Sequence, residues 1–219
     1  MTGLNLNYET NRFIRGMNIF ADCLLAGALW IFTSIPIVTM GASSTALYYT
    51  VNKCIRNERS YVWKEYFPAF KDAFKKSTLT WLIFLILGVF LFLDVNLMKQ
   101  VLQQESPLGA LYYFFLVLSA AALAWVFYVF PYMARFEGGI RETLQKSFVF
   151  MIVNMGWSAL LVVIFIACVL ICNHMQFLLI LFPGGFTLLQ NVILEKLFRK
   201  YMKPEDIQKE MEANRRWKQ

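Results

Sequence analysis

The sequence predicts an all-α, polytopic membrane protein with five membrane-spanning helices and a cytoplasmic C-terminus. Of its 219 residues, 58% are hydrophobic and 16% are charged, against about 25% charged residues in an ordinary soluble domain. The apolar residues come in runs of about 20, the length at which a helix crosses a hydrocarbon core about 30 Å thick. Segments rich and poor in lysine and arginine also alternate along the chain.

The apolar runs place the five spans. The first is ended by Pro36 and Gly41, because proline cannot continue a helix. The fourth and fifth are separated by the short polar turn CNHMQ. The expected spans lie near residues 17–36, 79–98, 108–131, 150–171 and 177–194. They are expected to form one membrane domain over residues 1–200, followed by a charged cytoplasmic tail over residues 201–219.

The positions of lysine and arginine predict the orientation of the spans. Eighteen of the 21 lie in residues 41–78, 132–150 and 195–219, and the other three are Arg12, Arg15 and Lys99. Cytoplasmic segments of membrane proteins carry the excess of these residues. The alternation then requires an odd number of spans with the N-terminus outside, in agreement with five. Because the basic residues adjoin apolar spans, we expect them to contact anionic lipid headgroups and not nucleic acid.

A short helix is predicted to follow the first span. Ser43 and Ser44 favour its N-terminus, because serine hydroxyls cap the free backbone N–H groups of a first helical turn. Its expected apolar face consists of Leu47, Val51, Cys54 and Ile55. Lys53 and Arg56 fall away from this face.

Residues 62–76 are predicted to form an amphipathic helix that lies on the cytoplasmic membrane surface. Four lysines in this segment would each be unfavourable at the bilayer centre. The expected apolar side contains Phe67, Phe70, Phe74 and Ser77. Since the residue before a proline disfavours helix, the regular part is expected to begin near Pro68.

The motifs of common enzymes are absent from the sequence. There is no GxxxxGK[ST], GxGxxG or HExxH, and the single histidine, His174, excludes a conventional histidine metal cluster. The string GASS at residues 41–44 resembles the serine motif of rhomboid-type intramembrane proteases. Proton transfer needs a base within about 3 Å, however, and His174 is expected at the opposite membrane face. We therefore expect no catalytic residue, no metal and no cofactor.

Polar residues near the outer ends of the spans are the candidates for a ligand site, since ionisable groups at membrane depth are often functional. The predicted outer vestibule consists of Asp22, Asp94, Asn96, Asn173, His174 and Gln176. The alternative is that the helix dipole stabilises Asp22, that Asp94 reaches the interface, and that neither binds a ligand. Deeper in the bilayer, hydrogen bonds between helices are expected for Asn154, Ser158, Gln190 and Asn191.

Two stretches, WIFTSIPIVTMGASSTALYYTVNKCIR at residues 30–56 and YFPAFKDAFKKSTLTW at residues 66–81, resemble the YesL family of bacterial, mostly Gram-positive membrane proteins. The family core Pro-x-x-Thr-x-Gly-Ala corresponds to Pro36, Thr39, Gly41 and Ala42. The aromatic-lysine block corresponds to Phe67, Phe70, Lys71, Phe74 and Lys75. The resemblance implies a small protein of the bacterial cell membrane, often encoded beside carbohydrate-uptake and carbohydrate-degradation genes. It brings no catalytic residues.

Two functions are therefore expected as alternatives. The first is an accessory or regulatory component of carbohydrate uptake or sensing, which contacts a membrane protein of an uptake system through its basic cytoplasmic helices. The second is a small-solute transporter. The strings WIFTSIP at residues 30–36 and WVFYVFP at residues 125–131 would then mark an internal repeat. The short chain and the lack of a charge at the bilayer midplane argue against transport.

Overall fold

The computed structural model describes residues 2–57, 60–104, 107–202, 208 and 212. All regular secondary structure within these residues is helical, as predicted. In chain order the helices are α1 (Thr2–Thr33), η1 (Ile37–Thr39), α2 (Met40–Thr50), η2 (Val51–Arg56), α3 (Val62–Gln103), η3 (Pro107–Ala110), α4 (Leu111–Arg135), α5 (Ile140–Val153), α6 (Met155–His174), η4 (Gln176–Leu179) and α7 (Leu181–Tyr201). The predicted tail, residues 201–219, falls almost entirely outside the described residues.

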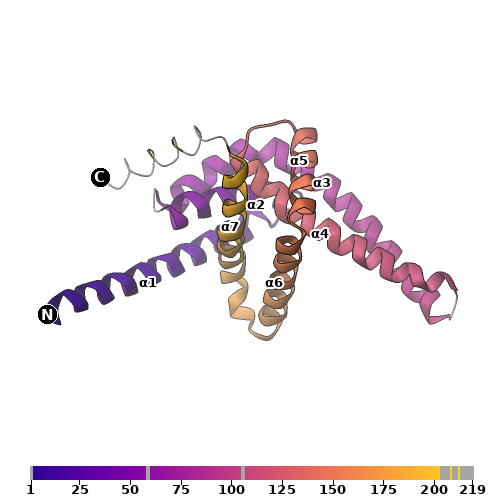
Figure 1. Cartoon of the computed structure of the whole chain (residues 1–219), viewed down its shortest axis with the longest axis horizontal. Helices are drawn as coiled ribbons and strands as arrows, with labels where there is room; N and C mark the ends of the chain where they lie inside the picture. The colour runs from indigo at the N-terminus through magenta and orange to yellow at the C-terminus, as the bar shows by residue number, and fades with distance from the viewer. Residues whose placement is uncertain (1, 58–59, 105–106, 203–207, 209–211, 213–219) are drawn as a thin grey trace.

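The helices form three arms that diverge from a common centre (Figure 1). One arm is α1, the second is the hairpin of α3 and α4, and the third is the pair of α6 and α7. Helix α2 lies at the centre and packs against α1, α3, α4 and α7. It is buried over almost its whole length, so it acts as the shared core of the arms.

Four stretches of helix are long and apolar enough to cross a membrane, counting only the described residues: Ile14–Thr33, Val62–Gln103, Leu108–Arg135 and Met155–His174. The second and third contain the expected spans 79–98 and 108–131, and the first and fourth overlap most of the expected spans 17–36 and 150–171. The fifth expected span, residues 177–194, corresponds to η4 and α7. Helix α7 is not among the four stretches, and it carries buried polar residues on the side that packs against the protein.

Helix α2 begins earlier than predicted. Ser43 and Ser44 lie inside the helix, and their hydroxyls donate to the carbonyl oxygens of Thr39 and Met40, four residues earlier. The predicted role of these serines as N-caps is therefore wrong, because the helix begins one turn before them. The predicted apolar face is confirmed, since all four of its residues are buried: Leu47, Val51, Cys54 and Ile55.

Helix α3 is a single helix of 42 residues, about 63 Å long at 1.5 Å per residue and so about twice the thickness of a hydrocarbon core. The prediction that this helix begins near Pro68 is wrong, because the helix starts at Val62 and continues through the proline. The predicted apolar side divides between two environments. Phe67 and Phe74 are exposed by 42% and 40%, respectively, whereas Phe70 packs on a buried cluster and Ser77 is buried. The side that packs against the protein also contains Val62, Tyr66, Thr80 and Phe84. The orientation of the predicted side toward the membrane stays a prediction.

Gly41 is needed where two helices touch, and not in the turn before α2. The turn is held by Thr39, whose hydroxyl lies within hydrogen-bonding distance of the carbonyl oxygens of Thr33 and Pro36. Gly41 lies inside α2, and a Cβ placed there would be 2.5 Å from both the carbonyl oxygen of Ser77 and the Cβ of Trp81 on α3. The expectation that this glycine helps to end the first span is therefore wrong, since α1 ends at Thr33 and Gly41 already lies inside the next helix.

The close contact at Gly41 leads to a testable prediction. Gly41→Val is expected to destabilise the fold by about 3 kcal/mol or more, because α3 cannot move aside without repacking the centre. Size-exclusion chromatography of detergent-solubilised protein should show a reduced folded yield. Gly88→Val is the control, since nothing lies within 4 Å of a Cβ at that position on α3. Equal yields for the two variants would contradict the prediction.

Hydrogen bonds between helices occur where deep polar residues were expected to make them. The Ser158 hydroxyl on α6 donates to the Tyr128 hydroxyl on α4 at 3.0 Å. The Gln190 amide on α7 donates to the carbonyl oxygen of Phe127 on α4 at 2.7 Å. Asn154 departs from the expectation, because its side chain donates to Phe150 within the preceding helix. It interrupts the helix between α5 and α6.

Candidate functional site

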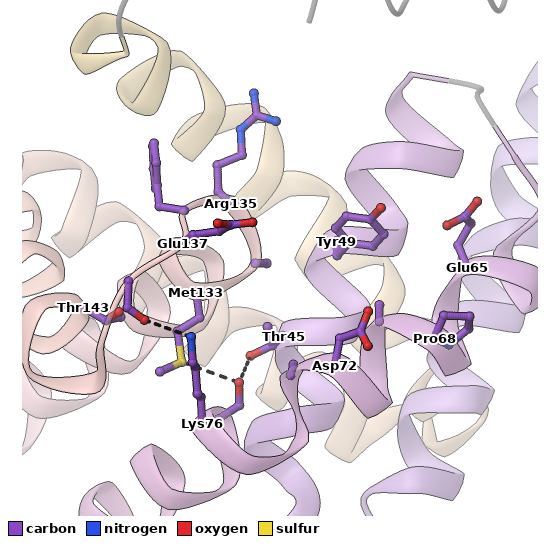
Figure 2. Close-up of a pocket in the computed structure, with 16 residues that line it drawn as sticks. Thr45, Tyr49, Glu65, Pro68, Asp72, Lys76, Met133, Arg135, Glu137 and Thr143 are labelled. Atoms are coloured by element: carbon purple, nitrogen blue, oxygen red, sulfur yellow. Dashed lines mark hydrogen bonds between the residues drawn. The ribbon is translucent and has the colours of Figure 1, made fainter. Parts of the chain in front are cut away.

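A polar pocket of about 500 Å³ lies where α2, α3, α5 and the end of α4 meet. Figure 2 shows its lining side chains converging from these elements. Its hydroxyl-bearing residues are Thr45, Tyr49, Ser77 and Thr143, and its charged residues are Glu65, Asp72, Lys76, Arg135 and Glu137. The volume is within the range of about 300–1,000 Å³ that is usual for small-molecule sites.

Two hydrogen bonds connect the walls of this pocket. The hydroxyls of Thr45 on α2 and Ser77 on α3 are 2.9 Å apart, and both residues are buried. The Lys76 ammonium donates to the carbonyl oxygen of Gly138, in the loop between α4 and α5, at 3.2 Å. Helix α3 is thereby linked to α2 on one side and to the loop on the other.

The carboxylates of the pocket differ in whether they are paired. Glu65 forms an ion pair with Lys53 of η2, with Nζ and Oε2 2.8 Å apart. Asp72 and Glu137 are exposed, and neither has a hydrogen-bond or ion-pair partner within the part of the chain that the structure describes. The pocket thus presents two carboxylates that are available to accept hydrogen bonds from a solute.

A buried charge cluster lies behind α2 and α4, centred on Glu195 of α7. The Glu195 side chain is fully buried. Its Oε1 accepts a hydrogen bond from Asn52 at 3.1 Å and one from the Tyr48 hydroxyl at 3.4 Å. Arg135 Nε lies 3.4 Å from the same oxygen, and Arg56 Nη1 lies 4.0 Å from Oε2. One carboxylate therefore joins α2, η2, α4 and α7.

The protonation of Tyr48 fits its place in this cluster. Burial, and then the neighbouring Glu195 carboxylate, raise the pKa of Tyr48 well above its ordinary value. Its hydroxyl therefore stays protonated and can donate to Glu195. Arg56 completes the cluster by donating to the backbone and side-chain oxygens of Asn191, at 3.2 and 3.0 Å.

Glu195 was not expected at a site, because its position follows the fifth expected span and begins a charged segment. Helix α7 continues to Tyr201, so Glu195 is an internal helical residue. A signal was present in the spacing of Thr187, Asn191 and Glu195. Polar residues four apart lie on one helix face, and this face is buried.

The six residues of the predicted outer vestibule lie on four different helices. Asp22 is on α1, Asp94 and Asn96 are on α3, Asn173 and His174 end α6, and Gln176 begins η4. Helices α1, α3 and α6 belong to different arms in Figure 1. Among the described residues, no hydrogen bond or ion pair connects the side chains of Asp22, Asp94, Asn96 and His174, and Asn96 donates to Phe92 of its own helix. Their ligand role stays a prediction.

The chain is similar to known proteins over most of its length. Residues 24–95 match the model of a family described as a protein of unknown function, DUF624. Over 207 residues, the chain is also 30% identical to the uncharacterized protein YesL of Bacillus subtilis (strain 168). The aligned region covers 90% of this chain and 94% of that protein. The chain belongs to the YesL family. No solved structure matches it.

The motif residues of the YesL family surround the junction of α1, α2 and α3. Pro36 directly precedes η1, Thr39 holds the turn, and Gly41 and Ala42 are buried against neighbouring helices. Phe70 packs on the buried cluster beside α2, whereas Lys71 is exposed. The matched region contains the α2 and α3 walls of the pocket. The α4 wall and Glu195 lie beyond it.

No metal centre is formed by the described part of this YesL-family chain. Nowhere within it do three or more histidine, cysteine, aspartate or glutamate residues lie close enough to hold a metal ion. The candidate site is the polar pocket together with the charge cluster behind it.

Proposed function

We propose that this protein binds a small, hydroxyl-rich solute in the polar pocket and serves as an accessory or regulatory component of carbohydrate uptake or sensing. The observation that supports this is the pocket lining itself, with two available carboxylates beside hydroxyl groups and an ammonium group. Carboxylates accept strong hydrogen bonds from sugar hydroxyls, and the Lys76 ammonium adds hydrogen-bond donors for the sugar oxygens. Tyr49 and Phe136 also line the pocket and offer aromatic surface to a sugar ring.

The proposed topology has five spans, with the pocket open to the cytoplasm. The segments around residues 41–78 and 132–150, which are rich in lysine and arginine, meet where the three arms converge, whereas the α3–α4 and α6–α7 turns lie at arm tips (Figure 1). All basic segments can then face the same side, as the positive-inside rule requires. Helix α7 is the fifth span in this arrangement, and the C-terminus is cytoplasmic.

Cysteine labelling of intact cells tests this topology. A cysteine at position 71 is expected to be protected from a membrane-impermeant maleimide, and one at position 103 is expected to react. Both positions are exposed in the structure, so a difference in labelling reports the membrane side. Lysed cells provide the control for reactivity. Labelling of position 71 from outside, or protection of position 103, would overturn the five-span arrangement.

The basic face of the N-terminal part of α3 is the proposed contact surface for partners. Lys64, Lys71 and Lys75 are exposed there, beside the apolar span of the same helix. This arrangement suits anionic lipid headgroups, or an acidic surface on a membrane protein of a carbohydrate-uptake system. Binding of solute in the adjacent pocket would then change the surface that such a partner contacts.

Solute binding can be measured directly. We expect a neutral mono- or disaccharide to raise the Tm of the protein in nanodiscs, and Asp72→Asn combined with Glu137→Gln to weaken binding about tenfold or more, because hydrogen bonds to charged groups contribute about 1.5–3 kcal/mol. Glu142→Gln is the control, since this exposed residue lies outside the pocket. If no sugar in a broad panel changes the Tm, the proposed solute class is wrong.

Transport of a small solute is the alternative function. The pocket lies beside the N-terminal part of α3 and the C-terminal end of α4, two helices long enough to span the membrane. A transporter's solute site that opens to one side of the membrane would have such a position. Proteoliposomes loaded with a radiolabelled sugar distinguish the two functions. Binding without flux supports a sensor or accessory component, and saturable flux supports a transporter.

A further inference from the structure

Glu195 contacts two walls of the pocket from behind. Its Oε1 accepts from Tyr48, the chain neighbour of the pocket residue Tyr49, and from Asn52 one turn later. The same oxygen lies 3.4 Å from Nε of Arg135, which lines the pocket at the last residue of α4. One buried carboxylate is therefore bonded to the α2 wall and to the α4 wall.

We propose that Glu195 is a positioning residue for the solute pocket, holding the end of α4 and the following loop at a fixed spacing from α2. This inference rests on the proposed function, because it concerns the same pocket. The α2 and α3 walls are joined by Thr45 and Ser77, and the α3 wall and the loop are joined by Lys76 and Gly138. A polar connection that joins α2 directly to the last residue of α4 runs through Glu195 and closes this ring.

The charges make this connection sensitive to the carboxylate itself. Arg56 and Arg135 approach opposite oxygens of Glu195, and their side chains are only 23% and 19% exposed. Without the negative charge between them, two guanidinium groups would repel each other in a poorly hydrated place. Arg135 is the residue that yields, because it ends α4 and is followed by a loop. Its movement displaces the pocket wall.

Spin labels on the pocket rim measure this displacement. Labels are placed at positions 72 and 137, both exposed and on opposite walls, in the full chain reconstituted in nanodiscs. Cys168 and Cys172 are replaced by alanine, and the buried Cys23 and Cys54 are left in place. We expect Glu195→Gln to lengthen the mean label distance and to broaden its distribution, and Glu195→Asp, which keeps the charge, to stay close to the parent.

Two arginine variants separate positioning from general stabilisation. Arg135→Gln removes the same connection from the wall side, so it should reproduce the wider pocket even if Glu195→Gln does not fold. Arg56→Gln removes a charge from the same cluster, but Arg56 does not line the pocket and contacts Asn191 and Glu195 of α7. The label distance should therefore stay parental in Arg56→Gln.

The label distances test the proposal in the absence of any solute. A wider pocket in Arg135→Gln but not in Arg56→Gln supports positioning by Glu195. The proposal is overturned if Glu195→Gln, Arg135→Gln and Arg56→Gln change the label distance equally, or if Arg135→Gln keeps the parental distance. Because the distance is measured in the empty protein, a failure to find a binding sugar leaves this result unaffected, and the two proposals can fail separately.

Discussion

Gly184→Ala is expected to remove most of the folded protein, although it adds a single methyl group. Helices α1 and α7 cross at this glycine, where a Cβ would overlap the backbone carbonyl group of Cys23. Gly27→Ala should act in the same way from the other helix, since its Cβ would overlap the carbonyl oxygen of Ile180. Overpacking against backbone, which cannot rotate away, is expected to destabilise by about 3 kcal/mol or more.

The chain offers matched controls for this crossing. Gly185 is the next residue along α7 and Gly16 lies on α1, and nothing is within 4 Å of a Cβ at either position. Alanine there should preserve or raise stability, because alanine favours helix over glycine by about 1 kcal/mol. Thermal unfolding of the four purified variants measures the difference. A parental Tm for Gly184→Ala would show that the helices are not in this close contact.

Glu195→Ala is the second change with a large expected effect. It removes the only carboxylate that lies between Arg56 and Arg135 in the described part of the chain. Breaking a buried ion pair from one side destabilises by about 3–5 kcal/mol, and partial access of both arginines to water favours the lower end. A fall in Tm in nanodiscs is the readout. Glu142→Ala, at an exposed pair with Lys146, should leave the Tm almost unchanged.

A double variant tests whether the loss comes from the remaining charges. Arg56→Gln is expected to destabilise on its own, but Arg56→Gln combined with Glu195→Ala should be less unstable than the sum of the two, because residues of one buried network couple. Strict additivity would instead indicate that the carboxylate acts through packing alone.

Local patterns in the sequence predicted the helices well. Runs of apolar residues identified the four stretches that can span a membrane, because hydropathy is a property of neighbouring residues. The buried face shared by α2 and η2 followed from the spacing of Leu47, Val51 and Ile55 for the same reason. The YesL family was also recognised from contiguous motifs.

The pocket and the charge cluster could not be predicted in this way. Asn52 and Glu195 are separated by 143 residues and Arg56 and Asn191 by 135, so their proximity depends on how the arms pack. Gly41 was misread because a glycine after a proline indicates a turn locally, whereas its partner Trp81 lies 40 positions later. The start of α3 was misplaced because tertiary packing of Val62 and Tyr66 extends the helix past Pro68.

The unbroken length of α3 has a mechanical consequence. The helix packs against α2 near Trp81, about 28 Å from its first residue and about 33 Å from its last at 1.5 Å per residue. A rigid rod that tilts about such a contact moves both ends by similar amounts in opposite directions. Any change in tilt that accompanies filling of the pocket would therefore be transmitted to the far end of the α3–α4 hairpin, which lies across the membrane from the pocket in the proposed topology.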